Sequence, residues 1–142
     1  MRVVSYTFVP FLLLALTAAR AETSSLTEHF QGTGRACYGT LAVEAKTISW
    51  LTPFSQCKPV PYEIVERDSF DGKMKTTYRL QRGAASCRYT VLTLTHSGVE
   101  DGSGWEVTGY GSEQSYRTDK SSGYKIRSED MMSCPLVRKR GQ

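Results

Sequence analysis

Hydrophobic and polar positions alternate along most of the chain with a period of two, which is the pattern of a β-strand with one buried face. In the clearest example, Leu41 and Val43 are followed by Ile48 and Trp50, and polar or small residues separate the members of each pair. The tripeptide 44–46 lies between the two pairs and contains two charged residues. We therefore expect two antiparallel strands joined by a turn at 44–46.

Further alternating segments follow, separated by short polar or glycine-containing stretches. The Asp71–Gly72 step is the clearest tight-turn motif in the chain. Residues 97–104 form a glycine-rich acidic segment, and residues 120–123 contain another turn motif. From these patterns we expect additional strands at residues 61–68, 73–81, 87–96, 105–111 and 124–128.

These patterns favour an all-β fold. No segment after residue 21 shows a sustained apolar period of 3.6, and turn motifs recur about every ten residues, as in antiparallel β-folds. About seven or eight short strands in one domain suit a small, closed or nearly closed antiparallel β-barrel. A two-sheet β-sandwich is the competing architecture.

The first 21 residues have the three-part pattern of a secretory signal peptide. Arg2 precedes an apolar run at residues 8–16, and the small residues Ala19 and Ala21 frame a cleavage site. The apolar run is too short to serve as a permanent transmembrane anchor. We expect an exported protein, periplasmic or secreted, whose signal peptide is residues 1–21.

The remaining residues are enough for one domain with its own core. Segment 22–34 is polar and contains two glycines, and we expect a mobile lead-in that adds at most a short edge strand near Phe30. The barrel domain then extends over residues 35–137, and a basic tail occupies residues 138–142.

Four cysteines follow the predicted signal peptide, and an even number in an exported chain predicts two disulfides. Four cysteines allow three pairings. The expected hairpin brings Cys37 opposite Pro53, from which a short loop could carry Cys57 back across its open end. We therefore favour a Cys37–Cys57 disulfide, which leaves Cys87 to pair with Cys134.

The folded body is close to electrically neutral. Loss of Arg2 and Arg20 with the signal peptide leaves 16 basic residues against 14 acidic ones, and three of the basic residues lie in the 138–142 tail. Nucleic acids and anionic membranes are bound by strongly basic surfaces, which this composition does not provide. A short basic tail is most simply a solvated terminus, and docking to a partner is the second interpretation.

The sequence contains no recognisable catalytic motif. Only His29 and His96 could act as an imidazole base, and cysteines in disulfides provide no thiolate nucleophile. Carboxylates are numerous, but their spacing selects no pair for acid–base chemistry. No two cysteines have the close spacing of a zinc site. We therefore expect a protein without enzymatic activity, catalytic residues, bound metal or cofactor.

One group of residues favours a binding role. Trp105, Tyr110, Tyr116 and Arg117 belong to the residue types that dominate protein interfaces. We expect His96 at a strand end beside the 97–104 loop, near the mouth of the barrel. The structural alternative is that the tyrosine rings pack within the fold and only their hydroxyl groups reach the surface.

Two functional hypotheses follow. The first is a binding protein that contacts another protein or an envelope component through surface loops and tyrosines, for example an inhibitor of a hydrolase. The alternative is a calycin-like carrier that holds a small apolar ligand inside the barrel. A barrel interior filled by side chains favours the binding protein, whereas an internal pocket favours the carrier. The side chains that we expect inside are Met74, Tyr78, Leu80, Leu92, Leu94 and Trp105.

Overall fold

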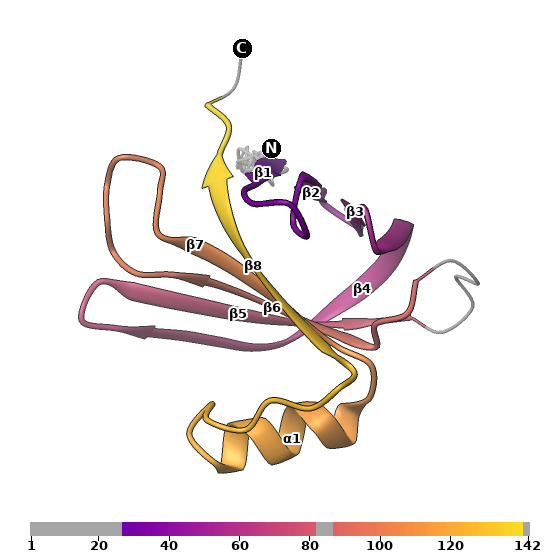
Figure 1. Cartoon of the computed structure of the whole chain (residues 1–142). Helices are drawn as coiled ribbons and strands as arrows, with labels where there is room; N and C mark the ends of the chain where they lie inside the picture. Colours follow the sequence, from indigo (N-terminus) through magenta and orange to yellow (C-terminus); the bar gives the residue numbers. More distant parts are fainter. Residues whose placement is uncertain (1–26, 82–86, 141–142) are drawn as a thin grey trace, which may run out of the picture.

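The computed structural model describes residues 27–81 and 87–140. Within these ranges, eight antiparallel strands form a closed barrel in which each strand pairs with its neighbours along the chain and β1 pairs with β8 (Figure 1). The predicted signal peptide lies outside the described residues. The strands are β1 (Glu28–Gly32), β2 (Gly39–Val43), β3 (Thr47–Thr52), β4 (Ser55–Phe70), β5 (Lys73–Leu80), β6 (Val91–His96), β7 (Trp105–Tyr110) and β8 (Met131–Arg138). The prediction of a small antiparallel barrel is therefore confirmed.

Both predicted hairpin turns are present. The backbone N–H of Glu44 donates to the carbonyl of Thr47 over 2.8 Å, which closes the turn between β2 and β3. Asp71 and Gly72 have φ angles of 52° and 72°, as a two-residue turn between β4 and β5 requires. The alternating patterns and the turn residues thus specify the register of both hairpins.

β1 lies inside the segment for which we expected a mobile lead-in with a short edge strand. It is not an edge strand, because it pairs with β2 on one side and with β8 on the other. Its Phe30 is fully buried, with its ring centroid 5.0 Å from that of Trp105. This segment therefore closes the barrel and contributes to its core.

The chain between β7 and β8 differs from the prediction. Residues Glu113–Ser121 form a helix, α1, which lies against the outside of the barrel (Figure 1). The strand expected at 124–128 is absent, because Gly123 and Tyr124 both have positive φ angles, of 71° and 63°, and the chain continues as an irregular connection to β8. Only Tyr116 and Asp119 of α1 are buried, so the helix has no sustained apolar period by which to recognise it.

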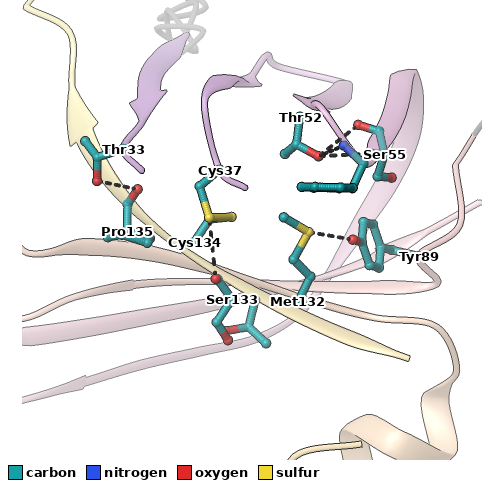
Figure 2. Close-up of a disulfide and its surroundings, with 11 residues drawn as sticks. Thr33, Cys37, Thr52, Ser55, Tyr89, Met132, Ser133, Cys134 and Pro135 are labelled. Carbon is teal, nitrogen blue, oxygen red and sulfur yellow. Dashed lines mark hydrogen bonds between the residues drawn. A yellow bond between two sulfur atoms is a disulfide. The ribbon is translucent and has the colours of Figure 1, made fainter. Parts of the chain in front are cut away.

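Two disulfides form, but their pairing is not the one we favoured. Cys37 pairs with Cys134 (Figure 2), and Cys57 pairs with Cys87. The β2–β3 hairpin is as predicted, but barrel closure places the loop before β2 beside β8, where the N–H of Thr33 donates to the Pro135 carbonyl over 3.1 Å. Cys37 therefore reaches a strand that the hairpin argument did not include.

Side chains fill the barrel interior. Trp50 is 1% exposed and stacks on Tyr89 with ring centroids 5.0 Å apart, and both rings pack against Gly109. Met74 differs from the prediction, because it lies at the end of β5 near the hairpin turn and is 46% exposed. The other five side chains expected inside are buried, namely Tyr78, Leu80, Leu92, Leu94 and Trp105.

Candidate functional site

Two of the predicted site residues, His96 and Trp105, form part of the barrel end that also holds the 97–104 loop. They pair across β6 and β7, and their rings stack with centroids 4.3 Å apart. Trp105 is only 7% exposed, and the ring nitrogen Nε2 of His96 lies 2.9 Å from the Val99 carbonyl oxygen. The two rings are therefore engaged with each other and with the loop.

Surface cavities of about 570 Å³ lie on both sides of this ring pair. One extends towards β4 and β5, and the other towards β1 and the basic residues after β8. Charges of both signs line the second cavity, and Arg138 is paired there with Glu28 at 2.8 Å. This mixture gives the barrel end no strong preference for an anionic or a cationic partner.

The tyrosines Tyr110 and Tyr116 attach α1 to the outer surface of the barrel. The Tyr110 hydroxyl donates to Asp119 Oδ2 over 2.9 Å, and the Tyr116 hydroxyl donates to Glu66 Oε2 over 2.7 Å. Lys120 Nζ also donates to Glu66, over 2.6 Å. These contacts link two strands to two successive turns of the helix, and both tyrosine rings are buried.

The charges around α1 follow from these contacts. Hydrogen bonds from Lys120 and Tyr116 lower the pKa of Glu66 to about 2. Burial, reinforced by the hydrogen bond with Asp119, raises the pKa of Tyr110 well above its usual range. At neutral pH Glu66 therefore carries its charge and Tyr110 keeps its proton, the two states that hold the helix in place.

The five predicted binding residues do not converge on one surface. Arg117 is exposed on α1 and bonds to Glu113 one turn earlier, at 3.3 Å. Trp105 and Tyr110 stand at opposite ends of β7, about 17 Å apart at the rise of a β-strand. His96 and Trp105 thus belong to one region, and Tyr110, Tyr116 and Arg117 to another.

The most exposed aromatic side chains lie elsewhere. Tyr38 is 71% exposed and Phe54 is 68% exposed, and Leu51 beside them on β3 is 39% exposed. We call these three residues the aromatic end. None of the three is among the binding residues predicted from the sequence. Tyr38 follows Cys37 directly. Phe54 is the second residue of the two-residue turn Pro53–Phe54 between β3 and β4, where its ring has no strand to pack against.

The two loops of the aromatic end are held rigidly and lie side by side. A Cβ atom at Gly39 would come within 1.9 Å of the Leu51 carbonyl oxygen, so only glycine allows this approach of β2 to β3. Thr52 Oγ1 accepts the N–H group of Ser55 over 3.0 Å (Figure 2) and that of Phe54 over 3.3 Å. Cys37 is bonded to Cys134 on β8, and Cys57 near the start of β4 is bonded to Cys87 in the segment before β6, so a disulfide lies next to each loop.

Three basic residues lie close along the chain to the aromatic end or to its disulfides. Arg35, Lys58 and Arg88 are all exposed, and each lies within three or four residues of Tyr38 or Phe54 or directly follows a disulfide cysteine. The described loop segments 33–38, 52–58 and 87–90 contain no acidic residue. The aromatic end therefore combines exposed rings with a positive periphery.

The described residues contain neither a metal-ligand cluster nor a membrane-spanning helix. They contain no group of three or more histidine, cysteine, aspartate or glutamate side chains placed to hold a metal ion. Their one helix is also far shorter and more polar than a membrane-spanning segment.

Comparisons with protein-family models, with curated proteins and with solved structures give no match to this chain.

Proposed function

We propose that this protein is an exported, non-enzymatic binding protein that docks on another protein through the aromatic end. The observation that carries the proposal is the exposure of Tyr38 and Phe54 on two rigid neighbouring loops. Large aromatic side chains that insert into a partner's pocket provide most of the free energy of many protein complexes. Loops that are already ordered lose little conformational entropy on binding, which favours a tight complex.

The charges at the aromatic end favour a particular kind of partner. Arg35, Lys58 and Arg88 are exposed, and the described segments 33–38, 52–58 and 87–90 that hold them contain no acidic residue. A complementary surface would have an apolar pocket bordered by carboxylates, which would also speed up association by electrostatic steering. An exported hydrolase with an acidic active-site cleft is one such partner, and the protein would then act as its inhibitor.

The packed interior argues against the alternative that the barrel carries a small apolar ligand. Trp50, Tyr78 and Leu92 are at most 5% exposed and occupy the central space, and Tyr89 covers one end. A ligand inside would have to displace these side chains at the cost of their own packing. Surface binding requires no such rearrangement.

Site-specific photo-crosslinking tests the proposal. A photoreactive amino acid replaces Phe54 in one version of the mature protein and Val99, which is 45% exposed at the other end of the barrel, in a second version. We expect crosslinking to one defined protein from Phe54 but not from Val99. The complex should form with one-to-one stoichiometry and without cleavage of either protein.

Two substitutions provide the matched control. Tyr38→Ala combined with Phe54→Ala should weaken binding of the captured partner by about a hundredfold or more, because each truncation removes an aromatic contact. Val99→Ala should leave binding unchanged. Equal crosslinking from both positions, or full binding by the double variant, would contradict docking through the aromatic end.

A further inference from the structure

A groove of about 280 Å³ lies on the outside of the barrel, between strands β5–β8 and the connection that follows α1. Lys75 on β5 lines one side, and Tyr124 and Arg127 of the connection line the other. Hydroxyl-bearing side chains form much of the remaining wall, including Thr108 and Ser133. The groove is separate from the aromatic end and does not enter the barrel interior.

The ammonium group of Lys75 is the unusual feature of this groove. Its Nζ atom is buried and has no hydrogen-bond partner among the described residues. It lies 3.2 Å from the centroid of the Tyr124 ring, which covers it. Desolvation by this burial lowers the pKa of Lys75 to about 8. A buried ammonium without an acceptor is costly, which indicates that an acceptor group is missing from the groove.

The nearby carboxylates do not supply that acceptor. Glu66 is bonded to Lys120 and Tyr116, and its charge acts on Lys75 without a hydrogen bond between them. Asp68 pairs with Lys75 across the β4–β5 ladder but makes no ion pair with it. The two carboxylate oxygens of Asp119 accept from the Tyr110 hydroxyl and the Ile126 N–H, over 2.9 and 3.1 Å.

Two more donors in the groove lack acceptors. The hydroxyl oxygens of Thr108 and Ser133 are 2.8 Å apart, and since only one hydroxyl can donate to the other, the second O–H remains free. Arg127 is exposed at the edge of the groove and makes no ion pair with any residue that the structure describes. Glu106, the remaining acid of the lining, is exposed to solvent. The groove thus offers more donors than acceptors.

We propose that this groove binds a small molecule through a carboxylate, which accepts hydrogen bonds from Lys75 Nζ and from the free hydroxyl of the Thr108–Ser133 pair. Arg127 adds positive charge at the edge. The Tyr124 ring, which covers Lys75 Nζ in the free protein, shifts off the ammonium when the carboxylate binds and packs against the body of the ligand. A volume of 280 Å³ corresponds to about nine water molecules, so the ligand has on the order of ten non-hydrogen atoms.

The test compares glucuronate with glucose, which has the same ring but no carboxylate, and includes acetate as the smallest carboxylate probe. Each is titrated into the mature protein while the amide and side-chain resonances are followed by NMR. Glucuronate should shift resonances of Lys75, Thr108 and Ser133, acetate should shift those of Lys75, and glucose should shift none of them. If neither carboxylate produces these shifts, or if glucose produces them equally, the proposal is wrong and the ammonium is solvated by water alone.

Two variants complete the test. Lys75→Met keeps an unbranched side chain, one atom shorter, but removes its charge, and it should weaken glucuronate binding by about tenfold or more, as expected for loss of a charge-assisted hydrogen bond. Lys73→Met removes an exposed lysine from the same strand, outside the groove, and should bind like the wild type. Unchanged binding by a folded Lys75→Met variant would also overturn the proposal. Neither result depends on the aromatic end or its partner.

Discussion

At the scale of single residues, side chains of the same type near turns differ widely in their exposure to solvent. Tyr38 and Tyr110 are both tyrosines close to turns, yet one is 71% exposed and the other 2% exposed. The sequence predicted the turns at 44–46 and at Asp71–Gly72 correctly but contained no information on which turns would be covered by other elements. Tyr110 is covered because α1 packs over it, a contact that depends on the irregular connection around Tyr124.

The ionised state of Glu66 is the clearest electrostatic contribution of one residue. Lys120 and Tyr116 hold the pKa of Glu66 at about 2, well below the ordinary value of 4.5. Because the folded-state pKa is lowered, Glu66 stabilises the protein above about pH 4.5, and this contribution is lost as the pH falls towards 2. Glu66→Gln should therefore lower the free energy of unfolding at pH 7 by roughly 1 to 2 kcal/mol.

Urea unfolding of the wild type and the variant at pH 7 and at pH 3 measures this effect. The difference between the two proteins should be smaller at pH 3, because Glu66 of the unfolded wild-type chain is then protonated whereas Glu66 of the folded protein is still mostly ionised. Glu63→Gln on the same strand is the control, since the Glu63–Arg79 pair is exposed and should contribute at most about 0.5 kcal/mol. A Glu66→Gln effect that stays constant across this pH range would contradict the assigned role of Glu66.

Among the elements, α1 is the one that the hydrophobic pattern could not predict. It is only nine residues long, and only two of its side chains are buried. Local sequence does define its start, where Ser112 and Ser115 cap the first turn reciprocally. Such a short polar helix obtains its stability from tertiary contacts, and these involve strands that are distant in sequence.

Removal of the Tyr110 hydroxyl tests how strongly this residue attaches α1 to the barrel. Tyr110→Phe leaves Asp119 Oδ2 buried without its donor, so we expect the free energy of unfolding to fall by about 1.5 to 3 kcal/mol. Amide hydrogen exchange should accelerate most in α1 and in the connection after it. The matched control is Tyr38→Phe, whose hydroxyl makes no hydrogen bond within the described residues, and its stability should not change. Equal effects of the two substitutions would rule out a special role for Tyr110.

At the scale of the whole molecule, strand number and class were predictable, whereas the way the barrel closes was not. Hairpins between consecutive strands follow from turn residues and alternation, as at Asp71–Gly72. The β1–β8 pairing joins residues about a hundred positions apart, and no local pattern encodes it. The disulfide prediction failed for the same reason, because Cys37 meets Cys134 only after closure.

The disulfide that accompanies closure should contribute most to stability. Cys37 and Cys134 are 97 residues apart in sequence, whereas Cys57 and Cys87 are 30 apart. In the chain-entropy model the longer loop is worth about 4.7 kcal/mol and the shorter about 3.6 kcal/mol. We therefore expect a Cys37→Ala, Cys134→Ala variant to unfold at lower denaturant concentration than a Cys57→Ala, Cys87→Ala variant.

Cys37 directly precedes Tyr38, and Cys57 lies three residues after Phe54. The two variants therefore also test whether the disulfides support binding by holding these loops in place, apart from their effect on the stability of the fold. Under conditions where both remain folded, each should bind the captured partner more weakly than the wild type, since one of the two loops is no longer tied to the barrel. Loss of affinity in proportion to loss of stability would instead mean that unfolding alone reduces binding. A folded variant that keeps full affinity without its disulfide would show that loop rigidity is not what favours the complex.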